Sequence, residues 1–302
     1  MKYNMKSINI LFGQGCDIDC IYCKRNYYHA KGVGSRTYED IIKDIEENAI
    51  KHKKEDISFL FTGVGEPLML PRFLDVCRKT RSLGISFSLE TNGIKLEDFE
   101  FCKQLVDLGL ERVSITFNSH IPEKYNEIIG GYNYFNDALK AFRNLEKLKI
   151  PVDVSIVILK QNLDHFYRIP LFIKQNFPKL KLERIVFHLV RINGPAEMFK
   201  DVAFKLSSHA KNIERSILRL RDEGFRIGFA SGGGSFPFCF FPELVKEFNY
   251  QINKFNDDKM HVKTRYCKGC RYYDKCPGIA STYLELYDDS EFKGKAFQER
   301  MG

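Results

Sequence analysis

The chain has 302 residues, of which 44% are hydrophobic and 28% are charged, and its formal net charge is +8. This length and composition predict a globular protein with one large α/β domain and a small appendage. The longest apolar runs fall short of the roughly 18 residues that a membrane-spanning helix needs, no signal peptide is visible, and the dispersed basic residues argue against nucleic acid as a partner.

The first predicted strand, residues 7–12, leads into a loop that carries Cys16, Cys20 and Cys23 in the spacing C-x3-C-x2-C. Thiolates at this density, without a secretory leader, favour an iron–sulfur cluster or zinc over disulfides and indicate a reducing cytoplasm. A structural zinc site closes with four ligands. Only three cysteines stand here, so one coordination position stays open; a 4Fe–4S cluster held by three cysteines would have one iron free for another ligand.

A predicted helix over residues 38–48 and a predicted strand over 57–61 come next, followed by a glycine-rich turn. Gly63 and Gly65 allow a ligand to approach the backbone closely, and Pro67 stiffens the turn. Glu66 supplies a carboxylate that suits a cationic amino group. Alone, the segment is an ordinary strand-to-helix turn, but after the cysteine loop it favours a ligand site.

The cysteine loop and this turn together resemble the signature of the radical S-adenosylmethionine (SAM) enzymes. In that family three cysteines hold a 4Fe–4S cluster, SAM chelates the fourth iron, and a Gly-Gly-Glu-Pro motif hydrogen-bonds the SAM amino group. The resemblance implies that Cys16, Cys20 and Cys23 bind the cluster. It also implies that SAM is bound by the turn and by the aromatic residue before the third cysteine, that is, by Gly63, Gly65, Glu66, Pro67 and Tyr22.

Strand-like and helix-like segments alternate through most of the remaining chain. Predicted strands lie at 85–89, 113–117, 152–159 and 185–190, and predicted helices lie at 70–83, 99–108, 135–148 and 166–175. About six βα units in succession predict an α/β fold with a parallel sheet, too short for a closed eight-stranded barrel. This matches the partial (β/α)6 barrel of the radical SAM family, over residues 1–225, with ligands at the carboxyl ends of the strands.

Further SAM contacts are implied by the resemblance after the third, fourth and fifth strands, at Asn92, Thr116, Asn118 and Asn162. Asn162 is equally well explained as a helix N-cap. The family's arginine that pairs with the SAM carboxylate falls at Ile129, so the sequence does not supply this contact at the family's position. Arg112, Lys160 and Arg191 are the alternatives, each of which is also explained as a rim or surface cation.

The βα pattern ends near residue 225, and a cysteine-rich segment occupies 226–302. Cys239 and the C-x2-C-x5-C set of Cys267, Cys270 and Cys276 supply four thiolates, enough to close a cluster or a zinc site. The set resembles the auxiliary-cluster extension of radical SAM enzymes called SPASM, in its shortened form called Twitch. It implies one auxiliary 4Fe–4S cluster, with zinc as the alternative. Cys77, Cys102 and most aromatic residues of this segment are predicted to lie in the core.

The resemblance implies a reaction in which a flavodoxin or ferredoxin supplies an electron and SAM is cleaved to methionine and a 5′-deoxyadenosyl radical. The radical then abstracts hydrogen from a substrate. A fully ligated auxiliary cluster suits an oxidative outcome, and enzymes with this extension often modify peptides. We therefore predict an oxidoreductase-type radical SAM enzyme that modifies or matures a peptide or protein, with its catalytic residues unassigned.

Other interpretations stay open. A radical SAM dehydrogenase of small molecules would carry the same motifs. A non-catalytic electron carrier or redox sensor would explain the cysteines, but a carrier normally ligates each cluster with four cysteines and has no use for Glu66. A zinc-stabilised interaction protein would explain the C-terminal cysteines but not the open position at Cys16, Cys20 and Cys23.

Overall fold

The computed structural model describes residues 5–13, 15–23, 36–63, 65–190, 196–229, 236–248 and 261–295. The chain divides into two compact units. Unit 1 comprises Met1–Ser155 and Leu171–Arg184, and unit 2 comprises Ile156–Pro170 and Ile185–Gly302. The domain boundary predicted at residue 225 stays a prediction.

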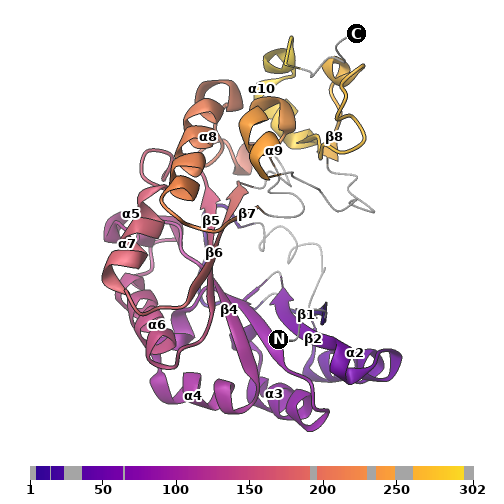
Figure 1. The fold of residues 1–302 in the computed structure, drawn as a ribbon, viewed down its shortest axis with the longest axis vertical. Coiled ribbons are helices and arrows are strands. Elements are labelled where there is room, and N and C mark those ends of the chain that lie inside the picture. The colour runs from indigo at the N-terminus through magenta and orange to yellow at the C-terminus, as the bar shows by residue number, and fades with distance from the viewer. Residues whose placement is uncertain are drawn as a thin grey trace. The chain divides into compact units, whose positions relative to one another are not determined.

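Seven strands form one sheet in the order in which they occur in the chain, and their paired registers are parallel (Figure 1). The predicted α/β fold with a partial parallel barrel is confirmed, and β7 adds one strand to the six that were predicted. A second sheet pairs β8 with β9. The strands are β1 (Lys6–Phe12), β2 (Ile57–Gly63), β3 (Phe87–Thr91), β4 (Leu110–Thr116), β5 (Val152–Ile158), β6 (Leu182–Leu189), β7 (Ile227–Phe229), β8 (His261–Val262) and β9 (Ile279–Ala280).

The α-helices follow the strands, and short 3-10 helices lie between them, among them η2 (Pro67–Met69), η3 (Ile94–Glu97) and η5 (Phe238–Phe240). Among the described residues, every helix is too short or too polar to cross a membrane. The α-helices are α2 (Tyr38–Lys51), α3 (Phe73–Ser82), α4 (Phe99–Asp107), α5 (Pro122–Ile128), α6 (Phe135–Lys147), α7 (Arg168–Asn176), α8 (Leu206–Asp222), α9 (Pro242–Phe248) and α10 (Ser281–Tyr287).

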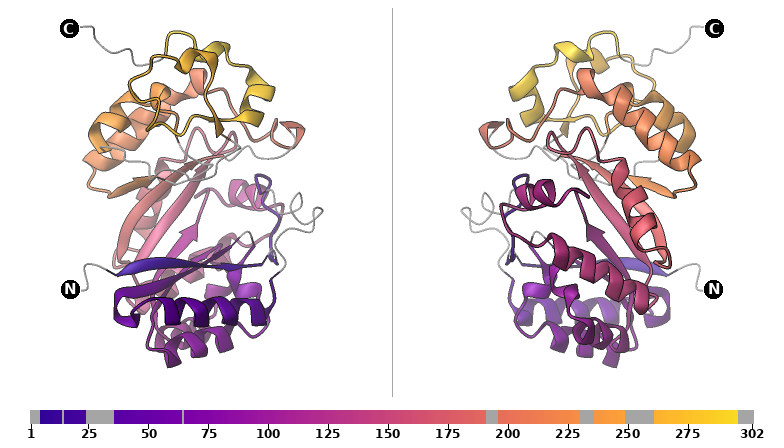
Figure 2. Two further views of the ribbon diagram at one scale, coloured as in Figure 1. Left: turned by 90° about the vertical axis from the view of Figure 1, so that its right-hand side faces the viewer. Right: turned by 90° about the vertical axis from the view of Figure 1, so that its left-hand side faces the viewer.

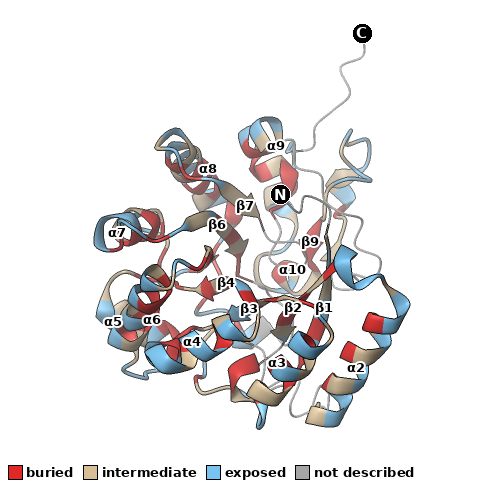
Figure 3. Ribbon diagram, turned by 60° about the horizontal axis from the view of Figure 1, so that its bottom comes forward, coloured by how far each residue is buried: buried red, intermediate tan, exposed pale blue. Residues whose placement is uncertain are grey.

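The core of unit 1 lies between one face of the sheet and its helices. Along β2, Ile57, Phe59 and Phe61 are buried while the residues between them are partly exposed, as the period of two in a strand dictates. Phe61 stacks on Phe87 of β3 with ring centroids 4.6 Å apart. Each helix turns its buried stripe inward (Figure 3), and the helices of unit 1, coloured indigo to magenta, line one side of the strands in Figure 2. Apolar burial therefore fixes the outer face of the sheet.

The opposite face of the same strands is polar. Ser114 of β4 lies within hydrogen-bond distance of Ser155 of β5, with 3.2 Å between their hydroxyl oxygens. Near the start of these strands, Arg112 and Arg184 both contact the buried carboxylate of Asp153. A partial barrel whose inner wall carries hydroxyls and charges is suited to a polar ligand.

In unit 2, hydrogen bonds fix the segment that precedes α9. The Glu214 carboxylate of α8 accepts the backbone N–H groups of Glu243 and Leu244, at 2.7 and 3.1 Å, and thereby satisfies free donors in the first turn of α9. At the other end of unit 2, the Tyr283 hydroxyl of α10 accepts the Leu206 N–H at 2.8 Å. The short helix η5, which carries Cys239, is therefore held close to α8.

Candidate functional site

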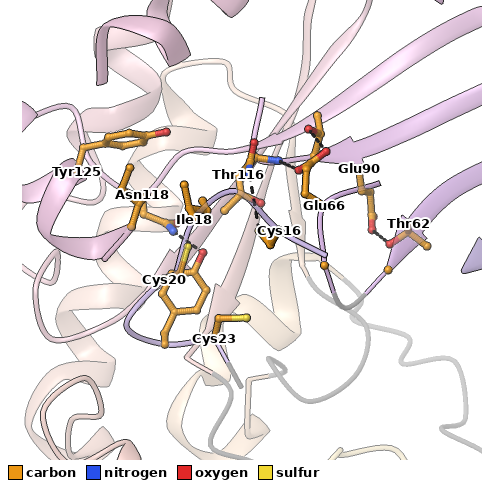
Figure 4. A pocket seen from close by; sticks show the side chains of 16 residues that line it. Cys16, Ile18, Cys20, Cys23, Thr62, Glu66, Glu90, Thr116, Asn118 and Tyr125 are labelled. Carbon is orange, nitrogen blue, oxygen red and sulfur yellow. Dashed lines mark hydrogen bonds between the residues drawn. The ribbon is translucent and has the colours of Figure 1, made fainter. Parts of the chain in front are cut away.

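A cavity of about 270 Å³ lies at the carboxyl ends of β1 to β4 in unit 1. This is the edge at which parallel α/β sheets bind ligands. The structure brings the three N-terminal cysteines to this one cavity, together with the glycine-rich turn (Figure 4). Its lining comprises Cys16, Ile18, Cys20, Tyr22, Cys23, Thr62, Gly63, Gly65, Glu66, Glu90, Thr91, Asn92, Thr116, Asn118, Tyr125 and Ile129.

Backbone hydrogen bonds hold the cysteine loop from two sides. On one side, the N–H groups of Gly65 and Glu66 donate to carbonyl oxygens of the loop's first residues, Gly13 and Gly15, at 3.1 and 2.7 Å. On the other side, loop N–H groups donate to the end of α5: Asp19 to Ile129 at 3.3 Å and Ile21 to Ile128 at 3.0 Å. The positions of the thiols are therefore set by two segments that are distant in sequence.

Two glycines make this close approach possible. A Cβ atom on Gly63 would lie 2.7 Å from the carbonyl oxygen of Phe12, which is at the end of β1. A Cβ atom on Gly130 would lie 2.4 Å from the carbonyl oxygen of Asp19, and Gly130 has a φ of +94°. Because both clashes are with backbone, no rotation of a side chain relieves them. A side chain at Gly63 would therefore displace the end of β1, from which the cysteine loop starts, and one at Gly130 would displace the loop itself.

The thiol set fits an iron–sulfur cluster. Burial, together with the neighbouring Cys23 and Cys16, raises the pKa of Cys20 to about 12, although a hydrogen bond with Tyr22 opposes the rise. Three thiolates at such a site repel one another, and iron would supply the compensating positive charge. Thiolates are also the ligand type that such clusters use. The assignment of Cys16, Cys20 and Cys23 as ligands stays a prediction that this geometry fits.

Glu66 makes three hydrogen bonds within the site, and it is only 4% exposed. Its Oε1 accepts the Thr91 hydroxyl at 2.7 Å and the Leu68 N–H at 3.1 Å, and its Oε2 accepts the Asn92 N–H at 2.7 Å. Burial raises its pKa to about 7, and these hydrogen bonds oppose the rise. A carboxylate accepts about four hydrogen bonds, so Oε2 keeps room for one more donor.

The residues predicted after β3 and β4 connect the cysteine loop to the sheet. The Asn92 side-chain amide donates to Asp17 Oδ1 at 2.6 Å, and its oxygen accepts the Ile94 N–H at 2.9 Å. Asn118 donates to the Tyr22 hydroxyl at 2.9 Å. Thr116, the last residue of β4, lines the cavity. In this structure Asn92 and Asn118 thus orient the loop that carries the cysteines, and their contact with SAM stays a prediction.

Sequence reasoning missed Thr62 and Glu90, which face the cavity from the inner wall. The Thr62 hydroxyl donates to Glu90 Oε2 at 2.5 Å, and the Glu90 side chain is exposed to the cavity. Thr62 directly precedes Gly63 of the glycine-rich turn, and Glu90 stands two residues before Asn92. Strand alternation was the available signal, because it turns Thr62 away from the buried Phe61 and Glu90 away from the buried Leu89.

The residues proposed to replace the family's arginine occupy different places. Arg112 pairs with Asp153 and lies four residues before the end of β4, outside the lining of the cavity. Lys160 is exposed in unit 2, and Arg191 lies outside the described residues. Ile129 itself lines the cavity, is 4% exposed and contributes its carbonyl oxygen to the cysteine loop. At the position of the family's arginine, the backbone of this chain therefore bonds the cysteine loop, and the residue that pairs with the SAM carboxylate stays unassigned.

Pro67 and Asn162, which were also predicted to contact SAM, have structural roles. Pro67 is buried as the first residue of η2 and does not line the cavity. Asn162 is fully buried in unit 2, where its side chain donates to the Val157 carbonyl at 2.8 Å and accepts the Leu159 N–H at 3.0 Å. It therefore closes the turn after β5, and its contact with SAM stays a prediction.

In unit 2, the four C-terminal cysteines line one small cavity although 27 residues separate Cys239 from Cys267. Burial, together with the neighbouring Cys276, Cys267 and Cys270, raises the pKa of Cys239 to about 12. Cys276 Sγ accepts the N–H groups of Phe238 and Gly278 at 3.5 and 3.4 Å. Backbone donors aimed at a half-buried sulfur fit a thiolate ligand.

The described residues contain no group of three or more His, Cys, Asp or Glu side chains arranged to hold a single metal ion. A zinc ion, with Zn–S bonds of about 2.3 Å, gathers its sulfurs within about 4 Å of one another. An iron–sulfur cluster distributes its cysteine ligands over several irons. The absence of such a group among the described residues therefore argues against a site for a single ion such as zinc, and it does not bear on an iron–sulfur cluster.

The remaining cysteines and aromatic residues confirm most of the core prediction. Cys77 and Cys102 are fully buried in α3 and α4, and Phe236, Phe238, Phe240 and Phe241 are at most 6% exposed. Tyr273 departs from the prediction. It is 45% exposed and lines the cavity of the C-terminal cysteines. A phenol tolerates this half-solvated place because its hydroxyl can remain in water.

Comparisons with known proteins agree with this geometry. A probable GTP 3′,8-cyclase of Pyrococcus abyssi is 25% identical over 227 residues, which cover 72% of this chain and 68% of the relative. The tungsten-containing aldehyde ferredoxin oxidoreductase cofactor-modifying protein of Pyrococcus furiosus is 26% identical over 165 residues, which cover 52% of this chain and 45% of that protein.

Solved structures share the fold. Streptococcus suis SuiB bound to precursor peptide SuiA has a TM-score of 0.61 at 14% identity, covering 98% of this chain and 75% of SuiB. Native anSMEcpe with bound AdoMet and Cp18Cys peptide has a TM-score of 0.57 at 17% identity, covering 95% of this chain and 96% of anSMEcpe. The sequence profile of the Radical SAM superfamily matches residues 10–173, more than half of the chain. The chain therefore belongs to the Radical SAM superfamily.

Proposed function

We propose that this protein oxidatively modifies a peptide or protein side chain by radical SAM chemistry, and that its C-terminal cysteines hold an auxiliary 4Fe–4S cluster of the Twitch type. The observation that carries the proposal is the presence of two separate thiol-lined cavities, one with three cysteines and one with four. When bound, SAM and the N-terminal cluster supply a 5′-deoxyadenosyl radical that removes a hydrogen atom from the substrate.

The chain's own residues bind and orient these groups. Cys16, Cys20 and Cys23 would hold the N-terminal cluster. Glu66 would receive the SAM ammonium group at its Oε2, where one acceptor position is left beside the Asn92 N–H. Glu90 and its partner Thr62 face the cavity and would meet hydrogen-bond donors of the substrate.

An oxidised product requires that the substrate lose a second electron and a proton after the hydrogen atom. Cys239, Cys267, Cys270 and Cys276 would hold the acceptor of that electron. The first electron, which reduces the N-terminal cluster, would come from a flavodoxin or ferredoxin. Cysteines that bind clusters must stay reduced, which suits the reducing cytoplasm where we place the protein.

Support for a peptide substrate comes from the fold. SuiB and anSMEcpe, whose folds this chain shares over 95% or more of its length, are described with bound peptides. A small-molecule substrate is the second candidate, because the P. abyssi relative that matches 72% of the chain is a probable GTP 3′,8-cyclase. The two candidates differ in substrate and share the SAM cavity.

The test uses anaerobically reconstituted protein with SAM and dithionite, and it quantifies 5′-deoxyadenosine and iron. A variant with Cys16, Cys20 and Cys23 all replaced by alanine should form no 5′-deoxyadenosine and keep about half the iron. GTP and peptides encoded beside the gene are then added separately, and mass spectrometry follows each. A peptide that loses two hydrogens supports the proposal. A converted GTP favours the second candidate, and iron-loaded protein that never cleaves SAM refutes both.

A further inference from the structure

One charged side chain reaches the cavity of the C-terminal cysteines. Among the described residues that line it, the others are the four cysteines and the aromatic residues Phe238, Tyr266, Tyr273 and Phe292. The exception is Lys263, which follows β8 directly. An ammonium group against half-buried thiols and aromatic rings is screened less by solvent than one on an open surface.

Contacts on two sides fix the position of this ammonium group. Lys263 Nζ donates to the carbonyl oxygen of Cys276. It also lies 5.3 Å from the centroid of the Tyr273 ring, within cation–π distance. The backbone of Lys263 is placed by the pairing of Val262 in β8 with Ile279 in β9. The charge is therefore held beside the last of the four cysteines.

The same cysteine receives the most backbone donors. The N–H groups of Phe238 and Gly278 point at Cys276 Sγ. Gly278 has a φ of +84°, and a Cβ atom there would lie 2.5 Å from the Val262 carbonyl oxygen. Glycine at 278 thus allows β8 to pass close to this residue. As a result, the Gly278 N–H group and the side chain of Lys263, which follows Val262, both reach Cys276.

Reduction adds one negative charge to an iron–sulfur cluster. A nearby cation and N–H donors to the sulfurs stabilise the reduced state more than the oxidised state, and this raises the reduction potential. We propose that Lys263 is a positioning residue that raises the reduction potential of the C-terminal cluster, so that this cluster accepts the electron a substrate loses on oxidation. The proposal rests on the proposed function, because it requires a cluster at these four cysteines.

The experiment measures that potential in the full-length chain. The alanine variant of Cys16, Cys20 and Cys23 leaves a single cluster, whose dye-mediated redox titration is followed by electron paramagnetic resonance. On this background, Lys263→Met keeps the apolar stem but removes the charge and should lower the potential. Lys263→Arg keeps the charge, so its cluster should have a reduction potential close to that of the variant with Lys263 unchanged. Lys268→Met is the matched control, because it removes an equal charge from an exposed residue beside Cys267 and should shift the potential far less.

Several outcomes would overturn the proposal. An unchanged potential in Lys263→Met, or equal shifts in Lys263→Met and Lys268→Met, would show that the held charge does not act on the cluster. Loss of iron in Lys263→Met but not in Lys263→Arg would show that the lysine serves assembly and not the potential. Absence of iron in the triple alanine variant would refute the C-terminal cluster itself, and the role of Lys263 with it.

Discussion

Replacing Gly130 with alanine should weaken unit 1 and release iron from the N-terminal cluster. Gly130 has a positive φ, and a new Cβ atom would lie 2.4 Å from the Asp19 carbonyl oxygen and 2.9 Å from its carbon. The neighbouring Gly131 has a similar φ of +88° but nothing within 4 Å of its Cβ position. The two alanine variants therefore share the backbone strain, and only one of them meets the cysteine loop.

The difference between them can be worked from these contacts. Backbone strain costs about 1–3 kcal/mol in either variant. In Gly130→Ala, the cysteine loop must also move away by about 1 Å to restore an ordinary contact, which strains the hydrogen bonds from Asp19 to Ile129 and from Ile21 to Ile128. Each is worth about 0.5–1.5 kcal/mol, so Gly130→Ala should lose about 1–3 kcal/mol more than Gly131→Ala.

The assay combines thermal unfolding of the anaerobic protein with iron analysis. At about 2–4 °C per kcal/mol, the Tm of Gly130→Ala should lie about 2–12 °C below that of Gly131→Ala. Gly130→Ala should also retain less iron and form less 5′-deoxyadenosine, while Gly131→Ala should keep the iron of the unchanged protein. Equal Tm values and equal iron in the two variants would refute the view that this contact sets the loop.

Three further changes test other parts of the structure. Cys239→Ala should lower the iron content and Cys77→Ala should not, because only Cys239 lines a thiol cavity; equal iron in both variants would remove Cys239 from the ligand set. Burial raises the pKa of Glu66 from 4.5 to about 7, so the stability it contributes is full below pH 4.5 and lost as the pH rises to about 7. Urea titrations of the unchanged protein should show this loss, on the order of 3 kcal/mol, and Glu66→Gln should lack it; parallel pH profiles would contradict the buried carboxylate. Asn144→Ala should cost about 2–4 kcal/mol of unfolding free energy, because Asn144 donates to the carbonyl oxygens of Leu96 and Glu97; a loss under 0.5 kcal/mol would show that these bonds are not needed.

The fold was predictable because its signals are local. Alternating burial along β2 and glycine-closed helices such as α3 follow from neighbouring residues, and the order of the seven strands follows from the βα succession. The strand predicted at 85–89 is β3 at Phe87–Thr91 and so begins two residues later than predicted, after the turn at Gly84 that ends α3. Helix α8 and strand β7 were not predicted.

The residues of the site were predictable only where they belong to a sequence motif with a characteristic spacing. The cysteine loop and the turn at Gly63 to Pro67 are of this kind, and the structure brings them to one cavity. The convergence of Cys239 with Cys267 depends on the packing of η5 near α8, which no spacing encodes. After Ile129, the adjacent glycines Gly130 and Gly131 were the available signal for unusual backbone.

A physical reason connects these failures. The cysteine loop is held by main-chain groups of β2's end and α5, and main-chain groups are identical in every residue. Their only trace in the sequence is glycine at the two points where chains nearly touch, Gly63 against Phe12 and Gly130 against Asp19. These contacts come from segments more than 60 residues apart, and they hold the thiols in place together with the side-chain bonds from Asn92 to Asp17 and from Asn118 to Tyr22. Because a Cβ atom at either glycine would meet backbone, substitutions at these two glycines should disturb the loop more than substitutions of its non-cysteine side chains.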